Sequence, residues 1–489
     1  MQSAFLIVSK HYKEKQAGVL FFVFGMAQFL FQTPSGYIMD YTNRKILVLC
    51  SAAIATTCLT VFTAYYATDY AGNFFLMVIV KFLQGAVTSL IPPGLNSITQ
   101  GIVGAVGMTK QVSVNEMMNH LGTSIIVIIG SVTAFLLYPD MGILFIVSPI
   151  ACLGVLFFLN RIRPEAIDHA AARGLKMESS TGDGDGKSSD IPVAQPYKPP
   201  PTASTTKQDP IQTFPSFNIG FGGSKTVKSS SDGVVVVPND EVKADTPLKV
   251  LRDPTLITFL LIVFLFHTAN GTVLPLVMQS LAIGNGGTGM LMSGLCIIVA
   301  QIFMVASAKI CGDYSGKYGR KGLFLTGFFS LPIRCLILVA LIHIRGDGTG
   351  SFWMQLAILS TQFLDGIGAG VFGTMYILVT SDISGGSGRF SLTLGLTTAA
   401  MSIGGTVSGY LGQALAEDLG YQKAFFILMI MSLVPAFLYL LCMPETLPAL
   451  VNRKDMEVGG VQMAQIKEEE DQQAGAAATS SKANYVEMY

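Results

Sequence analysis

The 489-residue sequence has little charge and no surplus of either sign. Only 13% of the residues are charged, 31 basic side chains balance 31 acidic ones, and 51% of the residues are hydrophobic. The mean hydropathy is +0.53. Such a chain is too apolar to be a soluble protein of this size, so we expect a polytopic membrane protein. The zero net charge gives no indication of a nucleic-acid partner.

The motifs of several chemistries are also missing. The sequence contains no P-loop, no nucleophile elbow and no His/Cys cluster with the spacing of metal ligands. We therefore expect neither an enzyme nor an ATP-driven pump, with no cofactor and no metal. A channel is disfavoured because there is no filter-like repeat. The seven cysteines lie in or beside apolar runs, where small buried residues are expected rather than disulfide partners.

Long apolar runs, by contrast, are abundant. A helix needs about 20 apolar residues to cross a bilayer, and the runs predict eleven spanning helices. Residues 17–160 would form an N-terminal transmembrane lobe and residues 254–443 a C-terminal one. The expected spans lie near 17–38, 46–67, 74–101, 117–138 and 142–160, and near 256–282, 288–311, 322–344, 353–380, 390–415 and 423–443.

The segments outside these lobes are polar. Residues 161–253 are rich in Ser, Gly, Pro and Lys and predict a disordered linker, because they cannot bury enough apolar surface to fold. The tail 444–489 is predicted to be disordered for the same reason. Residues 1–16 are expected to be the remnant of one further helix followed by a polar loop.

Two short basic segments organise the spans. Gly36–Lys45 (GYIMDYTNRK) and Gly312–Lys321 (GDYSGKYGRK) each separate two apolar runs and predict a tight hairpin. These segments are 276 residues apart, and a second pair of motifs, KFLQGAVTS at 81–89 and QFLDGIGAG at 362–370, is 281 residues apart. Two motifs repeated at nearly one offset indicate two homologous halves.

Both hairpins resemble the G-x-x-x-D-[RK]-x-G-[RK]-[RK] loop of the major facilitator superfamily. The first copy departs from it at Tyr41 and Asn43, and the second has Gly316 where the aspartate belongs. Residues 81–85 resemble the R-x-x-Q-G signature of the superfamily's helix 4, and residues 444–446 its P-E-[ST] ending. The resemblance implies an all-α major facilitator fold with two pseudo-symmetric helical lobes. Segments such as 264–277 and 115–122 also resemble a branch of mostly bacterial facilitators with no assigned substrate.

The distribution of Lys and Arg predicts the orientation. Basic residues of both hairpins, the linker flanks and the tail fall on one side of the predicted spans, so the linker and the C-terminus are expected to be cytoplasmic. The sequence does not indicate which membrane holds the protein.

Polar residues within the spans are candidate functional groups, since they are costly in lipid. The resemblance implies that helices 4, 7 and 10 line a central cavity, so Lys81, Gln84, His267, Asn270 and Asp365 would face the cargo. Asp365 and His267 are expected to form the coupling or cargo-binding pair, whereas Arg334 is expected to be a snorkelling or paired structural charge. Each Gln or Asn has the alternative of an interhelical hydrogen bond. The candidates are Asp365, His267, Asn270, Gln84, Lys81, Gln28 and Gln301.

The hairpins are expected to act as latches. In the carriers that the chain resembles, the first-copy aspartate meets the start of helix 11, which places Asp40 near Gly388 and Arg389. Glu116 is expected at the start of helix 5, either facing the second hairpin or capping its own helix. The candidate gating residues are Gly36, Asp40, Arg44, Lys45, Glu116, Gly312, Lys317, Arg320, Lys321 and Arg389.

These features predict a secondary active transporter that moves a small solute across the bilayer by alternating access, as a monomer. Proton coupling is one expected mode, because burial raises the pKa of a carboxylate and lowers that of an imidazole, so that both groups can titrate near neutral pH. The alternatives are a non-transporting receptor or scaffold of the same fold and a drug-type exporter. The exporter is the weaker alternative because helix 5 lacks the G-x-x-x-G-P-x-x-G-G pattern.

Overall fold

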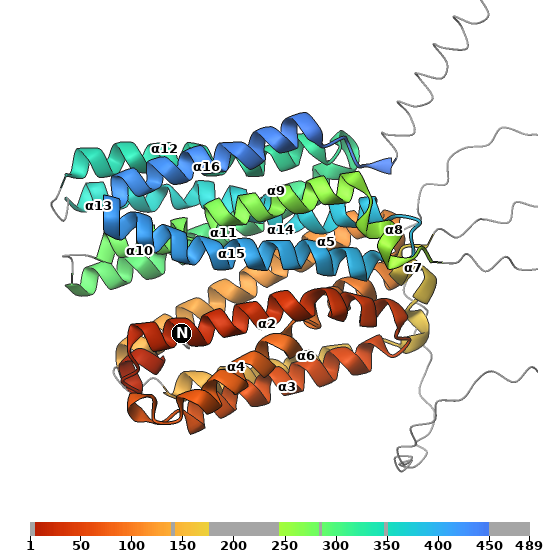
Figure 1. Ribbon diagram of the computed structural model, residues 1–489, viewed down its shortest axis with the longest axis horizontal. Helices are drawn as coiled ribbons and strands as arrows, with labels where there is room; N and C mark the ends of the chain where they lie inside the picture. The colour runs from red at the N-terminus through yellow and green to blue at the C-terminus, as the bar shows by residue number, and fades with distance from the viewer. Residues whose placement is uncertain (1–4, 138–141, 176–243, 283–285, 347–350, 449–489) are drawn as a thin grey trace, which may run out of the picture. The chain divides into compact units, whose positions relative to one another are not determined.

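The computed structural model describes residues 5–137, 142–175, 244–282, 286–346 and 351–448, and within these ranges every regular element is helical. Figure 1 shows the helices. The predictions for residues 176–243 and for the tail beyond 448 lie outside the described residues.

The N-terminal lobe consists of long apolar helices in the predicted order. They are α2 (Glu14–Tyr41), α3 (Lys45–Tyr66), α4 (Phe74–Thr88), α5 (Ile91–Leu137) and α6 (Val147–Leu159). The 47-residue α5 is two helical stretches that meet at Gly104, whose φ of +66° lies in the left-handed region that glycine enters without a Cβ clash. The second stretch therefore begins about a dozen residues before the span predicted at 117–138.

The C-terminal lobe repeats this plan. Its helices are α9 (Pro254–Asn270), α10 (Val273–Ala282), α11 (Gly286–Tyr318), α12 (Lys321–Arg345), α13 (Phe352–Ser360), α14 (Gln362–Ser384), α15 (Phe390–Leu419) and α16 (Tyr421–Cys442). In the described part of the chain, nine segments are long and apolar enough to span a membrane, and one of them, Phe74–Gly130, has 57 residues. The 57-residue segment is long enough to cross the membrane twice, which gives ten crossings. The shorter apolar helix α6 adds one more and brings the total to the eleven predicted.

Short elements occupy the ends of the predicted linker. α7 (His169–Arg173) and α8 (Pro247–Leu251) are helical, and Asp168 caps α7 by accepting hydrogen bonds from Ala170 and Ala171 at 2.8 and 3.0 Å. The prediction of disorder over 161–253 therefore does not hold for these two flanks.

The larger apolar core lies in the C-terminal lobe. Rings of Phe266, Phe324, Phe328, Phe372 and Tyr439 pack there with centroid separations of 4.7–5.9 Å. Other large apolar side chains, such as Phe75, Tyr410 and Leu441, are exposed on the outside of the bundle. Side chains of this kind suit contact with lipid, so the predicted fold class, an all-α polytopic membrane protein, is confirmed.

Two antiparallel helix pairs join the lobes, α2 with α15 and α5 with α11 (Figure 1). We call α2–α15 the first seam and α5–α11 the second seam. Gly36 packs so closely on the backbone of Ser391 that a Cβ would collide with it, and Gly312 packs equally closely on Ser113. The two contacts occupy equivalent positions in the two halves, so the internal repeat predicted from the sequence recurs in the packing.

Candidate functional site

The hairpin end of the bundle, where residues 42–44 and 319–320 connect their helices, carries the contacts that hold the first seam. Asp40 is 1% exposed, and its carboxylate accepts hydrogen bonds from the backbone N–H groups of Ser391 and Leu392 at 3.0 and 2.9 Å. These groups belong to the first turn of α15, where N–H groups have no partner within the helix and the helix dipole favours a negative charge. Asp40 thus binds one lobe to the other.

Arg389 does not join Asp40, contrary to expectation. Its guanidinium lies over the rings of Tyr37 and Tyr41, 5.6 and 4.9 Å from their centroids, and donates to the Tyr41 hydroxyl at 3.0 Å. Tyr41 occupies a position that is basic in the superfamily loop. In this chain the hairpin therefore supplies an aromatic ring, and the positive charge over it comes from Arg389 of the opposite lobe. Lys45 is buried and donates to the carbonyl of Met39, whereas Arg44 is exposed.

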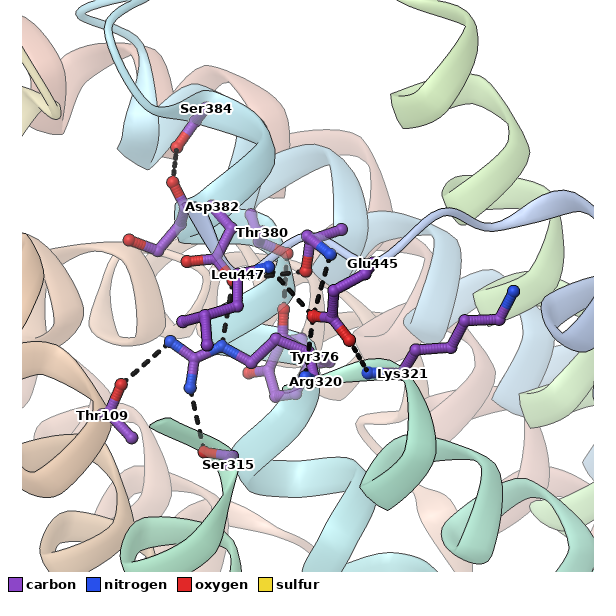
Figure 2. Close-up of polar contacts among 12 residues, drawn as sticks. Thr109, Ser315, Arg320, Lys321, Tyr376, Thr380, Asp382, Ser384, Glu445 and Leu447 are labelled. Carbon is purple, nitrogen blue, oxygen red and sulfur yellow. Dashed lines mark hydrogen bonds and ion pairs between the residues drawn. The ribbon is translucent and has the colours of Figure 1, made fainter. Parts of the chain in front are cut away.

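Arg320 holds the second seam (Figure 2). This side chain is 3% exposed and donates to Thr109 of α5 at 2.9 Å, to Ser315 at 2.9 Å and to Asp382 at 3.0 Å. Since Thr109 lies in the N-terminal lobe and Asp382 in the C-terminal lobe, the guanidinium links the two. Of the other basic residues predicted here, Lys317 is exposed and lies over the Tyr318 ring.

Glu445 completes this network from the chain segment after α16. Its carboxylate accepts hydrogen bonds from the backbone N–H groups of Arg320 and Lys321, at 2.8 and 3.1 Å, and so caps α12 (Figure 2). Thr446 also donates to Asp382 at 3.2 Å. The P-E-[ST] residues of the tail are therefore part of the second hairpin.

Gly316 stands at the position equivalent to Asp40, and the structure gives a reason for its lack of a carboxylate. The facing helix, α5, extends back to Gly104, so Ser113 lies well inside it, whereas Ser391 lies in the first turn of α15. N–H groups inside a helix already have partners. An aspartate at position 316 would find no free N–H group to bind.

A segment around α7 crosses the hairpin end between the lobes, and we call residues 164–175 the strap. In the N-terminal lobe, Asp168 donates its N–H to the carbonyl of Gly101 at 2.9 Å. At the other end, the carbonyl of Gly174 accepts from Gly386, in the loop before α15, at 2.7 Å. Burial, with smaller effects from the nearby positive charges of Lys45 and Arg173, lowers the pKa of His169 in this strap.

Lys81 and Gln84 lie together inside the N-terminal lobe. Lys81 is 1% exposed and donates to Gln84 at 2.8 Å, and Gln84 donates to Thr60 of α3 at 2.8 Å. This chain of hydrogen bonds links α3 and α4, which is the structural alternative considered for such residues. The predicted orientation of both side chains toward a cargo path is not seen. Gln28 lies on α2 beside Gly85.

Asp365 has a partner, and that partner is not His267. Its carboxylate binds the Nη1 of Arg334, and the Nη2 of Arg334 donates to Gln362 at 2.8 Å. The side chains of Arg334 and Asp365 are 1% and 8% exposed, so the pair is sealed between α12 and α14. The expected pairing of Asp365 with His267 is therefore wrong, and Arg334 is the paired charge that was the second alternative for it. The reason is that Arg334 reaches Asp365 from a different helix, at a separation in sequence that no local pattern reveals.

His267 and Asn270 occupy α9. The Nδ1 of His267 lies 3.0 Å from the carbonyl of Val263, and the ring packs edge-on against Phe372 at 4.7 Å. Asn270 lines a pocket of about 180 Å³ together with Arg334 and Asp365. The free space between these side chains is too small to hold a solute.

The remaining candidates meet at the second seam. Gln301 of α11 lies 2.8 Å from the Nδ1 of His120 on α5, and the Nε2 of His120 lies 3.8 Å from the carboxylate of Glu116. Glu116 therefore does not face the second hairpin and does not cap its helix, because Gly104, a dozen residues earlier, sets the start of that stretch. Sequence reasoning missed His120; its spacing of four residues from Glu116 was the available signal.

Comparisons with known proteins agree on one family. The sequence pattern described as the Major Facilitator Superfamily matches residues 2–360 and 312–478. Uncharacterized MFS-type transporters from two strains of Mycobacterium tuberculosis are 28% identical over 459 residues, which cover 94% of this chain and 92% of theirs.

The fold is also similar to a solved structure, the proton:xylose symporter XylE bound to 6-bromo-6-deoxy-D-glucose. The TM-score is 0.58 at 14% sequence identity, over 92% of this chain and 95% of the symporter. An identity this low shows a common fold and nothing about the solute. With the family pattern matched over most of the sequence, the chain belongs to the major facilitator superfamily.

Proposed function

We propose that this chain is a secondary carrier that moves a small polar solute by alternating access, with the two lobes separating and closing at the hairpin end. The observation that supports this most is the construction of the two seams. Each seam has a glycine–serine contact at the same position in its half, and each is held at the hairpin end by a few polar contacts, from Asp40 in one seam and Arg320 in the other.

The strength of those contacts suits a switch. A hydrogen bond to a charged group contributes about 1.5–3 kcal/mol, and two conformations that exchange differ by only a few kcal/mol. The bonds of Asp40 are also replaceable, since water can hydrate both the carboxylate and the freed N–H groups once the seam opens. Most of the larger apolar core lies inside the C-terminal lobe, and of the N-terminal lobe only Met108 and Val112 of α5 are among its fully buried members, so opening the seams would leave most of it undisturbed.

The hairpin end is proposed to be the cytoplasmic end, because the basic residues of both hairpins and of the strap gather there. The solute would then pass between the lobes, as a monomer in the bilayer. The proposed transport cycle uses no nucleotide, in keeping with the transporter family to which the comparisons point.

Labelling of buried seam positions tests the proposal without knowledge of the solute. Ser391 and Ser113 are 0% and 3% exposed, so cysteines at these positions are inaccessible while the seams stay closed. In the full-length protein in lipid, both should react slowly but measurably with a water-soluble maleimide, followed at each residue by mass spectrometry. A cysteine at Cys335, also 0% exposed but within the C-terminal lobe, is the control and should not react. Equal protection of all three positions would contradict alternating access.

A further inference from the structure

The packing of the helices does not explain why two titratable side chains lie at the second seam. Glu116 and His120 lie four residues apart on one face of α5, about 18 Å along the helix axis from its break at Gly104. Their side chains are 19% and 12% exposed. Groups of this kind, mid-way along a spanning helix and at a lobe boundary, are costly without a function.

The hydrogen bond to Gln301 determines the tautomer of His120. The Oε1 atom of Gln301, 2.8 Å from Nδ1, only accepts hydrogen bonds, so Nδ1 carries a proton. In a neutral imidazole the other nitrogen then carries no proton and presents a lone pair. That nitrogen, Nε2, is buried, has no hydrogen-bond partner in the described part of the chain, and faces the carboxylate of Glu116 at 3.8 Å.

A lone pair and a carboxylate that face each other in a buried site repel unless a proton is added to one of them. With that proton the pair is neutral overall, either as a carboxylic acid beside an imidazole or as a carboxylate beside an imidazolium. Without it the pair carries one negative charge. Burying a net charge is unfavourable, so closure of the seam favours the protonated pair.

Among the residues that the structure describes, no neighbouring cation offsets that charge. On α5 itself Lys110 is exposed and six residues away from Glu116. From α11 the pair meets the uncharged Gln301, and the nearest charged residue along that helix, Lys309, is exposed. The groups that α14 brings to the pair are Gly373 and the hydroxyl of Tyr376.

The charged residues on the other packed elements are engaged or distant. On α14, Asp365 and Asp382 each bind an arginine. Charged residues occur only at the ends of α2, α3 and α15, and those of the short α7 lie at the hairpin end. The uncharged Asn119 of α5 also donates to Glu116, at 3.4 Å. The protonation state of Glu116 and His120 therefore depends on the seam and on this neutral donor, and not on a nearby charged group.

We propose that Glu116 and His120 are the proton-binding site of this carrier: the pair holds one proton while the second seam is closed and exchanges it with water when Gln301 withdraws. The proposal rests on the alternating access proposed above. On opening, the proton leaves to water and the hydrated pair retains one negative charge. On closing, one proton is taken up. Acidic pH consequently favours the closed seam.

The test measures seam closure as a function of pH. Spin labels on cysteines at Arg163 of the N-terminal lobe and Thr326 of the C-terminal lobe, both exposed at the hairpin end, report the distance between the lobes by pulsed electron resonance in nanodiscs. The background chain carries serine at the cysteines that are not buried: Cys50, Cys58, Cys152 and Cys442.

The wild-type chain should show two distances whose ratio shifts toward the shorter one as pH falls from 8 to 5. One linked proton changes that ratio by up to about tenfold per pH unit. Glu116→Gln should abolish the shift and keep both distances. His120→Gln should move the shift to lower pH, because the carboxylate then titrates alone. Retention of the wild-type pH profile in Glu116→Gln would overturn the proposal, as would a wild-type chain that populates both distances in a ratio that does not change with pH.

Two control variants separate this site from other titrating groups. Glu165→Gln makes the same chemical change on an exposed carboxylate of the same lobe, and His169→Gln removes the histidine of the strap. Both variants should keep the wild-type pH profile. Loss of the pH-dependent shift in either variant would assign the shift to Glu165 or His169 instead of the Glu116–His120 pair.

Nitrogen NMR of the histidine rings tests the pair even in a chain that does not move. The His120 signals should show the Nδ1–H tautomer, and their titration should change in Glu116→Gln. If the spin labels report one distance at every pH, alternating access fails, yet a titration that depends on Glu116 would still support the site. A His120 titration unaffected by Glu116→Gln overturns the site alone.

Discussion

Two acid–base pairs inside the bundle, Arg334–Asp365 and Glu116–His120, differ in place and in partner. The first lies within one lobe, is almost fully buried and joins a guanidinium to a carboxylate. The second lies where two lobes meet, is more exposed and has a contact of 3.8 Å through a nitrogen that need not be charged. Arginine stays protonated and histidine does not, so we expect the first pair to hold the fold and the second to respond to pH.

The largest effect is expected from breaking the first pair. Asp365→Asn leaves the charge of Arg334 buried without its counter-ion, so the free energy of unfolding should fall by about 3–5 kcal/mol. Thermal unfolding of the detergent-solubilised protein measures this. The double variant Arg334→Met with Asp365→Leu removes both charges and should recover most of the loss. A single variant as stable as the wild type would show that the pair is not an essential structural contact.

Asp40 is a carboxylate with a third kind of partner, the N–H groups of the opposite lobe. Asn at this position keeps one acceptor oxygen and loses the charge, which should weaken the closed first seam by about 1.5 kcal/mol. A Ser391→Cys reporter should then react roughly tenfold faster with maleimide. Asp313→Asn makes the same change on an exposed aspartate beside the second hairpin and should leave the rate unchanged. Identical rates in all three proteins would exclude Asp40 as a latch.

Gln301 distinguishes the two pairs further, since only the second depends on a partner from across a seam. Gln301→Leu removes the acceptor of His120 Nδ1–H and should destabilise the closed seam by about 1 kcal/mol. The expected readout is a roughly fivefold faster reaction of a Ser113→Cys reporter. Gln422→Leu, on the exposed start of α16, is the matched control. A slower reaction in the Gln301 variant would mean that this hydrogen bond opposes closure.

The smallest effect is expected at Thr109. Thr109→Val removes one of the several acceptors of Arg320, so about 0.5 kcal/mol and a roughly twofold faster reaction of Ser113→Cys are expected. Thr326→Val serves as the control, because the Thr326 hydroxyl bonds only to its own helix. A change of tenfold or more would indicate that Thr109 is the main contact of the second seam.

The fold class could be predicted from the sequence because a lipid bilayer restricts the structures that can cross it. A bilayer requires helices of a set length with satisfied backbone groups, so the apolar runs alone predict the number of crossings. The meeting of Asp40 with the start of α15 was also expected, from the resemblance of residues 36–45 to the superfamily loop. The structure has that contact, and its role in gating remains a prediction.

The partners within the candidate site were harder to predict, for two physical reasons. Helices far apart in sequence come together through packing, so nothing local indicated that Arg334 reaches Asp365. The predicted spans 74–101 and 117–138 left residues 102–116 between them, although most of these residues belong to a helix that starts at Gly104; this error placed Glu116 at a helix terminus. With the helix start corrected, Glu116 and His120 fall on one face, and their relation to Gln301 becomes visible.

The most direct test of the account asks whether the two seams move together. A Cβ on Gly316 would lie 3.8 Å from the Cγ2 of Thr109, so cysteines at these two positions are close enough to be linked across the second seam by a short bifunctional methanethiosulfonate reagent. Lobes that rock as rigid bodies predict that this cross-link slows the maleimide reaction of Ser391→Cys in the distant first seam, and that a reductant restores the rate. An unchanged rate in the cross-linked protein would contradict the proposed movement of the lobes.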